Sequence, residues 1–182
     1  MCGIAGIISP NSSFLEQPLL KKMADMLAHR GPDGEGFWIN RKNTAGLAHR
    51  RLSVIDLTPA AAQPMHYLDR YTIVYNGEIY NYPELKKDLQ KAGYSFASAS
   101  DTEVILAAYD CYHERCVQYL DGMFSLAIWD EKQQTLFMAR DRFGEKPFYY
   151  HKSKDAFYFA SEMKALWAIG VEKTAEQKML LN

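Results

Sequence analysis

The chain shows two different periods of hydrophobic positions. The stretch CGIAGII at residues 2–8 is almost continuously apolar and predicts a buried first strand with Cys2 at its leading edge. Gly3 and Gly6 would let a neighbouring group approach this strand closely. The stretch LLKKMADMLAHRG instead has the helical period, with a stop signal at Gly31. One face of this predicted helix carries Leu19, Leu20, Met23, Met26 and Leu27.

Three further helices are predicted downstream. PELKKDLQKAG has Pro83 in its first turn and Gly93 after its end, as helix boundaries usually do. SDTEVILAAYDCY begins with Ser100 and Glu103 at the spacing of a capping box. EMKALWAIG, near the end of the chain, returns to the helical period.

Short runs of aromatic and β-branched residues predict the strands. They lie at residues 36–39 and 44–49, in YTIVYNGE, and in a meander made of GMFSLAIWD, TLFMARD, PFYYH and AFYFAS. Apolar residues at both alternating positions indicate sheets covered on both faces. Most connections are too short for helical crossovers, so the pattern favours a layered α+β sandwich over a doubly wound parallel sheet. The proline-punctuated DLTPAAAQPM predicts irregular structure.

Composition limits the number of domains, the kinds of partner and the cellular compartment that the chain suggests. With 182 residues, 48% of them hydrophobic, the chain has enough apolar material for one core of ordinary domain size. A formal net charge of -1, with scattered Lys and Arg, argues against nucleic acid or an anionic membrane as a partner. The odd cysteine count and the lack of a leader or membrane-length apolar run favour a cytoplasmic protein.

No metal site is predicted. Cys111 and Cys116 are five residues apart, which is not a zinc-ligand spacing, so we interpret them as structural thiols. The histidines also share no ligand spacing; they are His29, His49, His66, His113 and His151.

Cys2 is the first candidate for chemistry. If Met1 is removed, Cys2 becomes the N-terminal residue and its thiol stands beside a free amine. The amine titrates near ~7.7–8.0 and the thiol near ~8.5, so proton exchange between them at neutral pH is nearly thermoneutral. An N-terminal nucleophile can therefore use its own amine as the base. From position alone, a small apolar residue that begins a strand is an equal alternative.

Two polar stretches are further candidates. An Asn-Gly pair such as that in YNGEIYN signals a hairpin turn, but the Asn76 amide and the Gly77 N–H could also direct two donors at one oxygen. Glu78 adds a carboxylate beside them. In AHRRLSVID, Arg50 and Arg51 face opposite ways because strand side chains alternate. The inward arginine would suit capture of a carboxylate, whereas a solvated pair is the alternative.

Asp101 and two charged loops have structural explanations on pattern alone. An acid in the first turn of a helix is favoured by the helix dipole without any ligand. RGPDGEG and RDRFGEKP are glycine-containing turns flanked by opposite charges. Ion pairing that fixes the loops is the default explanation for both, and neither contains a phosphate-binding glycine pattern.

Taken together, the motifs resemble the glutaminase half of the glutamine-hydrolysing asparagine synthetase family. The resemblance runs in order from Met1 to about Trp167 through MCGIAGI, RGPDGEG, AHRRLSVIDL, YNGEIYNY, SDTEVIL, LDGMFSLAIWD, ARDRFGEKPFYY and ASEMKAL. It implies a class II glutamine amidotransferase domain over residues 1–170 with the N-terminal nucleophile hydrolase fold. In that fold, a four-layer αββα sandwich, two antiparallel sheets lie between helical layers.

The resemblance also assigns catalytic roles. Cys2, after loss of Met1, matches the nucleophile that attacks the glutamine side-chain amide, with its own α-amine relaying protons. Asn76 and Gly77 match the two donors to the oxyanion.

The remaining matches concern substrate binding. Arg51, rather than Arg50, matches the arginine that holds the α-carboxylate of the substrate. Glu78 and Asp101 match the groups that receive its α-ammonium, which overturns the structural explanation of Asp101. A backbone segment that lines the glutamine pocket matches Leu52, Ser53, Val54 and Ile55.

The implied reaction is hydrolysis of L-glutamine to glutamate and ammonia through a γ-glutamyl thioester. In this family an ATP-dependent synthetase domain with an S-G-G-x-D-S loop follows, and the sequence contains no such loop. We therefore expect residues 171–182 to begin the linker to that domain, and this chain alone to release ammonia without making asparagine. No cofactor is expected for this domain, since ATP and Mg would belong to the synthetase domain. A homodimer is left open.

Three alternatives stay open at the level of sequence. The ammonia could serve another acceptor, such as an amino sugar or a β-lactam-forming synthetase. An N-terminal cysteine amidohydrolase acting on acyl amides would not need the charges of Arg51, Glu78 and Asp101. A non-catalytic module could keep the fold, but it would have no reason to keep nucleophile, oxyanion donors and charges together.

Overall fold

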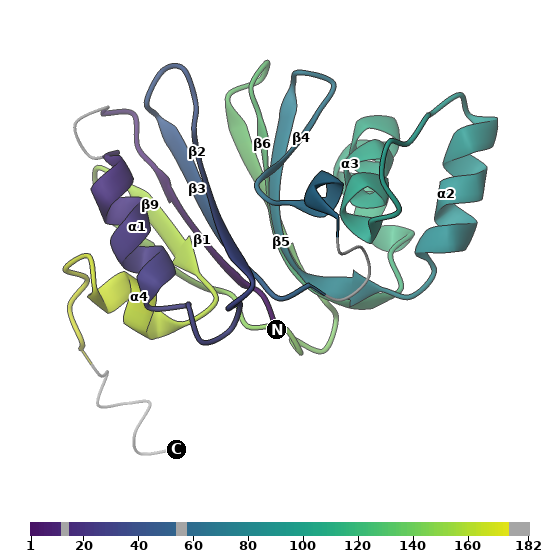
Figure 1. The fold of residues 1–182 in the computed structure, drawn as a ribbon. Helices are drawn as coiled ribbons and strands as arrows, with labels where there is room; N and C mark the ends of the chain where they lie inside the picture. The colour runs from purple at the N-terminus through teal and green to yellow at the C-terminus, as the bar shows by residue number, and fades with distance from the viewer. Residues whose placement is uncertain (12–14, 54–57, 175–182) are drawn as a thin grey trace.

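The computed structural model describes residues 1–11, 15–53 and 58–174 and shows two antiparallel sheets packed face to face (Figure 1). The strand order is β2-β3-β1-β9-β8 in the five-stranded sheet and β4-β5-β6-β7 in the four-stranded sheet. Helices cover the outer face of each sheet. This arrangement confirms the predicted α+β fold class, a four-layer αββα sandwich.

The strands have the following bounds. The five-stranded sheet contains β1 (Gly3–Ile8), β2 (Gly34–Ile39), β3 (Ala45–Arg51), β8 (Tyr149–Lys152) and β9 (Phe157–Ala160). The four-stranded sheet contains β4 (Met65–Tyr67), β5 (Tyr71–Ile79), β6 (Gly122–Asp130) and β7 (Thr135–Arg140). Strand β1 therefore lies inside its sheet, between β3 and β9, as its continuous apolar character predicts.

The helices divide between the two outer faces. On the five-stranded sheet lie α1 (Gln17–Asp25) and α4 (Met163–Trp167). On the four-stranded sheet lie α2 (Tyr82–Lys91), α3 (Asp101–Tyr112) and the 3₁₀ helix η3 (His113–Gln118). The stretch predicted to be irregular contains one further 3₁₀ helix, η2 (Pro59–Ala61), before β4 begins.

The prediction of one four-stranded meander was wrong. Strands β6 and β7 pair in one sheet, and β8 and β9 pair in the other. The link between these hairpins is held by the Asp141 carboxylate rather than by the ion pair expected in RDRFGEKP. This carboxylate accepts backbone N–H bonds of 2.8–3.2 Å from Phe124, Phe143, Glu145 and Lys146. These bonds hold the pKa of Asp141 below its usual value although burial raises it.

One helix boundary and one helix cap also differ from the prediction. Helix α1 ends at Asp25 and not at Gly31, because the chain tightens into turns with bonds such as Leu27 N–H to Ala24 O at 2.9 Å. Ser100 caps α3 by accepting the Thr102 N–H at 3.1 Å, but it forms no capping box. Glu103 binds the preceding loop instead, where it accepts the N–H groups of residues 97 and 98.

The core between the sheets is apolar. It contains Ile4, Leu47 and Phe159 from one sheet and Val74, Ala127 and Trp129 from the other. Phe159 is fully buried and stacks on Phe148 with ring centroids 5.2 Å apart. Close approach to β1 depends on glycine, as predicted, since a Cβ at Gly6 would lie 2.2 Å from the Phe159 ring.

We therefore expect Gly6→Ala to overpack this layer. The substitution should lower the free energy of unfolding by about 1–3 kcal/mol, because the Phe159 ring would have to shift. Chemical denaturation measures this change. Gly34→Ala is the matched control, since its Cβ would meet nothing closer than Arg51 Cβ at 3.8 Å. Equal stability changes in the two variants would contradict this view of the core.

Candidate active site

A cavity of about 220 Å³ lies where β1, β3 and β5 meet the N-terminus of α3. Seven of the residues proposed from the sequence line it: Cys2, Arg51, Leu52, Asn76, Gly77, Glu78 and Asp101. Sequence reasoning missed several other lining residues, notably His49, Gln63, Tyr75, Thr102 and Lys146. The structure thus collects side chains from positions as far apart in the chain as Cys2 and Lys146.

Three proposed residues are not placed in this cavity. Ser53 is not among the lining residues, and its backbone N–H donates to Asp33 Oδ2 at 2.8 Å. Val54 and Ile55 lie outside the described residues, so their part in the pocket stays a prediction.

The Cys2 thiol is held by the backbone of Leu52, directly after β3. The Leu52 N–H donates to Sγ at 3.4 Å, and the thiol donates to the Leu52 carbonyl at 3.5 Å. Burial raises the pKa of the Cys2 thiol above its usual value. Since the thiolate is the nucleophilic form, this thiol needs a base close by.

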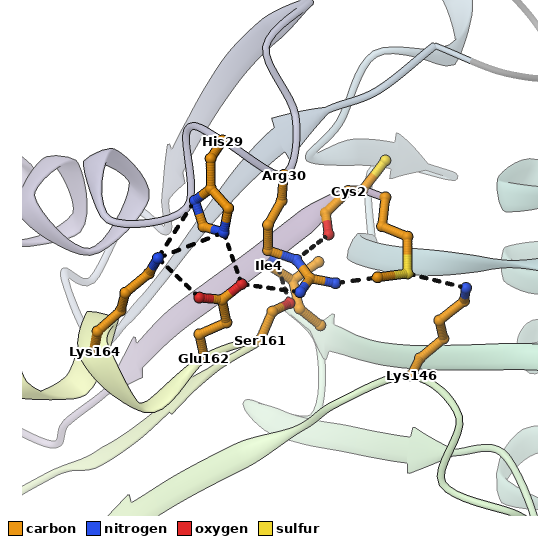
Figure 2. A network of polar contacts seen from close by, with 9 residues as sticks. Cys2, Ile4, His29, Arg30, Lys146, Ser161, Glu162 and Lys164 are labelled. Atoms are coloured by element: carbon orange, nitrogen blue, oxygen red, sulfur yellow. Dashed lines mark hydrogen bonds and ion pairs between the residues drawn. The ribbon is translucent and has the colours of Figure 1, made fainter.

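Arg30 binds the backbone of Cys2 (Figure 2). Its Nε donates to the Cys2 carbonyl at 2.9 Å, and its Nη1 pairs with Glu162 Oε1 at 3.0 Å. Glu162 also contacts His29 and Lys164, at 2.9 and 3.0 Å. Although burial opposes it, hydrogen bonds from Arg30, Lys164 and His29 lower the pKa of Glu162 to about 2. An ion pair thus holds the RGPDGEG loop, as predicted: it joins Arg30, the first residue of the loop, to the distant Glu162.

Alternate backbone N–H groups of β5 point from the edge of the strand that does not pair with β6. The N–H of Tyr75 donates to Gln63 Oε1 at 2.6 Å, and that of Ile79 donates to Asp101 Oδ2 at 3.1 Å. The N–H of Gly77 lies between them and points the same way, because ladder N–H groups alternate in direction along a strand. Opposite it, both backbone polar groups of Phe124 bind Asp141 instead. Gly77 therefore presents its N–H on the cavity side of β5.

Asn76 supplies a second donor. Its side chain is 1% exposed, and its Nδ2 has no hydrogen-bond partner among the described residues. A buried donor of this kind costs free energy unless something binds it. Because Asn76 also lines the cavity, its amide and the Gly77 N–H both stay candidates for the two donors to one oxygen atom that the sequence predicts. A Cβ at Gly77 would lie 2.3 Å from the Met123 carbonyl oxygen, so this position requires glycine.

His49 lies next to Asn76 in a neutral form. Its Nε2 bonds to the Tyr75 carbonyl at 3.2 Å. Burial lowers the pKa of His49 to about 4, so at neutral pH the ring carries one proton, on the nitrogen that faces the carbonyl. His49 therefore adds no charge to the cavity at neutral pH.

The two arginines of β3 point in opposite directions, as predicted from strand alternation. Arg50 lies on the α1 side, where its guanidinium contacts Asp25 Oδ1 at 2.5 Å and Glu35 Oε2 at 2.8 Å. Arg51 lines the cavity, and its Nη1 donates to the Thr58 carbonyl at 3.1 Å. Of the two arginines, Arg51 is therefore the one that lines the cavity.

Two acids also line the cavity. Glu78 is half-buried near the end of β5, and Asp101 is buried at the first residue of α3. Burial raises the pKa of Asp101 and the charge of Glu78 adds to the rise, while hydrogen bonds from Tyr75 and backbone N–H groups oppose it. The cavity thus combines one thiol, two candidate N–H donors, two cations (Arg51 and Lys146) and two acids.

No group of three His, Cys, Asp or Glu side chains in the described part of the chain is arranged to hold a metal ion. None of the described helices is long and apolar enough to cross a membrane.

Comparison with known sequences places the chain in a family. The sequence model of a glutamine amidotransferase domain matches residues 1–182. The chain belongs to the glutamine amidotransferase domain family. Two similar relatives of this amidotransferase domain come from Bacillus subtilis (strain 168). Asparagine synthetase [glutamine-hydrolyzing] 3 is 44% identical over 92% of this chain, and synthetase 1 is 42% identical over 99% of it.

The amidotransferase domain spans only 28–29% of the length of these two synthetases. Among solved structures, it is similar to glutamine phosphoribosylpyrophosphate amidotransferase from B. subtilis complexed with ADP and GMP. The TM-score is 0.75 at 21% identity, over 93% of this chain and 44% of that one. This likeness confirms the fold of the amidotransferase domain.

From the ion pairs of Glu162 we predict a pH-dependent contribution to the free energy of unfolding. The folded pKa of Glu162, about 2, lies below its usual 4.5, so the stabilisation is complete above about pH 4.5 and is lost as the pH falls toward 2. Because Glu162 is about a quarter exposed, we expect Glu162→Gln to cost only about 1–2 kcal/mol at pH 7. Denaturant titrations at pH 7 and below pH 4 should show this difference shrinking in acid.

Glu35→Gln is the control, since Glu35 is ion-paired with Arg50 but lies outside the support of Cys2. A stability difference for Glu162→Gln that stays constant from pH 7 into acid would rule out this ionic support.

Proposed function

We propose that this domain hydrolyses the side-chain amide of L-glutamine to glutamate and ammonia through a thioester on Cys2. The observation that carries the proposal is the gathering of Cys2, the Asn76 and Gly77 donors, and charges of both signs around one cavity. The names of the relatives, glutamine-hydrolysing asparagine synthetases, support the choice of glutamine.

The charges account for an amino-acid substrate. An α-carboxylate would pair with Arg51, and an α-ammonium would pair with Glu78 and Asp101. A plain acyl amide carries no charge to pair with Arg51, Glu78 or Asp101, whereas a zwitterionic amino acid carries both signs. This argues against an N-terminal cysteine amidohydrolase acting on apolar amides. With the substrate held at its α-carbon, the side-chain amide can reach the thiol.

The first step forms the thioester. Once Met1 is removed, the free α-amine of Cys2 accepts the thiol proton, and the thiolate attacks the amide carbon of glutamine. The negative charge that develops on the amide oxygen is held by Asn76 Nδ2 and the Gly77 N–H. The amine then gives its proton to the leaving nitrogen, so the C–N bond breaks and ammonia departs.

The second step hydrolyses the thioester and regenerates the free Cys2 thiol. Water attacks the γ-glutamyl thioester while the amine takes a proton from it, and the same two donors hold the second oxyanion. The C–S bond breaks, the thiol regains its proton and glutamate leaves. If Met1 stayed attached, the Cys2 nitrogen would be an amide and could not act as the base, so the mechanism requires its removal.

The ammonia would serve a synthetase domain in a longer protein. The relatives that this chain matches are several times longer and carry the name asparagine synthetase, which favours asparagine formation as the use of the ammonia. Under this proposal ATP and Mg would act only in that second domain, and residues 171–182 would begin the link to it. Transfer of ammonia to another acceptor is the second candidate, since nothing in the cavity selects the acceptor.

Cys2→Ala tests the proposed chemistry. Without the thiol no thioester can form, so glutamate release should fall at least about 10³-fold. An enzyme-coupled glutamate assay measures the rate, on protein whose intact mass shows that Met1 is absent. Cys111→Ala is the matched control, because Cys111 is a free, half-buried thiol that does not line the cavity. Retention of activity in Cys2→Ala, or equal loss in both variants, would overturn the proposal.

A further inference from the structure

Two buried tyrosines of β5 each bind an aspartate of α3. Tyr71 donates from its hydroxyl to Asp110 Oδ1 at 2.9 Å, near the C-terminal end of the helix. Tyr75 donates to Asp101 Oδ2 at 2.8 Å, at the first residue of the helix. Of the two pairs, only Tyr75 and Asp101 line the cavity. The first pair joins sheet to helix, whereas the second also forms part of the candidate active site.

The carboxylate of Asp101 is oriented through a single oxygen. The Tyr75 hydroxyl and the Ile79 N–H, which donates at 3.1 Å, both bind Oδ2. Two donors on one oxygen fix the plane of the carboxylate. Tyr75 is 3% exposed and Asp101 is 4% exposed, so water contributes little to holding this group.

Asp101 needs this support in order to bind a cation. Burial and the nearby charge of Glu78 both raise its pKa, and a protonated Asp101 would not attract an ammonium group. On its own helix, Glu103 binds the preceding loop instead. The cations Arg51 and Lys146 also line the cavity. Among the described residues, Tyr75 is the one side chain that donates a hydrogen bond to the Asp101 carboxylate.

The backbone of Tyr75 is held on both sides. Its N–H donates to Gln63 Oε1 at 2.6 Å, and its carbonyl faces His49 Nε2 at 3.2 Å. Burial also raises the pKa of Tyr75 well above 10, so the hydroxyl keeps its proton and remains a donor at neutral pH. Because Tyr75 directly precedes Asn76, one short segment positions both an oxyanion donor and an acid.

We propose that Tyr75 is a positioning residue, which holds Asp101 ionised and oriented toward the α-ammonium group of the substrate. This inference rests on the proposed function and adds a determinant of substrate selection to it. Tyr75 would act on binding of the α-amino group and not on the chemistry at Cys2. Loss of its hydroxyl should therefore raise KM and leave kcat nearly unchanged.

Tyr75→Phe removes the hydroxyl and keeps the ring. Removing one hydrogen bond to a charged group should weaken glutamine binding about tenfold. Calorimetry in the Cys2→Ala background, which cannot turn over, measures the Kd. The loss of binding in acid should also move to higher pH, because the pKa of Asp101 would rise further. Glutaramate, which is glutamine without its α-amino group, should bind equally well to both proteins.

Tyr71→Phe is the matched control, since it removes a tyrosine–aspartate bond from the same strand and helix outside the cavity. It should leave the Kd for glutamine unchanged. In the Asp101→Asn background, adding Tyr75→Phe should have no further effect on glutamine binding. This comparison still tests the coupling if Tyr75→Phe lowers stability.

Three results would overturn the role of Tyr75: unchanged glutamine affinity in Tyr75→Phe, equal losses for glutamine and glutaramate, or an additional loss in the Asp101→Asn background. A different result bears on the proposed function itself. If the Cys2→Ala chain with Tyr75 intact binds no glutamine and the processed chain releases no glutamate, the function assigned to the cavity fails, and the role of Tyr75 fails with it.

Discussion

The packed layer between the two sheets fixes the candidate active site. Cys2 lies two residues before Ile4, and Asn76 lies two residues after Val74, so each continues a row of side chains that faces this layer. The same holds for His49 and Arg51 after Leu47. The site is thus the polar end of an apolar layer. Its geometry depends on the packing of this layer, in which Gly6 leaves room for the Phe159 ring.

The residues that line this polar end are held in place by other residues around the cavity. Arg30 holds the backbone of Cys2 from the helical side and is itself neutralised by Glu162. Tyr75 holds Asp101 from the core of the other sheet. Arg51 and Glu78 line the cavity from β3 and β5. Rigid groups that hold the reacting and binding side chains reduce the ordering cost when a substrate arrives. A zwitterionic amino acid matches this distribution of charge.

Local pattern predicted much of this arrangement. Alternation along β3 separated Arg51 from Arg50, and the apolar first strand placed Cys2 at a leading edge. The resemblance supplied the role of Asp101, which pattern alone could not, because an acid at a helix start needs no ligand. Tyr75, Gln63 and Lys146 were missed because their contribution arises from contacts between distant segments. The assignment of β6–β7 and β8–β9 to separate sheets was missed for a related reason: the link between these hairpins is held by one carboxylate, that of Asp141, which binds four backbone N–H groups.

The central claim is that glutamine reacts covalently with the N-terminal thiol. The most direct measurement mixes glutamine with protein of confirmed N-terminus, stops the reaction in acid and locates any adduct by peptide mass spectrometry. The account predicts a γ-glutamyl group on Cys2 in chains without Met1 and none in chains that keep it. An adduct on Cys111 or Cys116, an equal yield with Met1 attached, or glutamate release with no adduct on Cys2 would contradict the account.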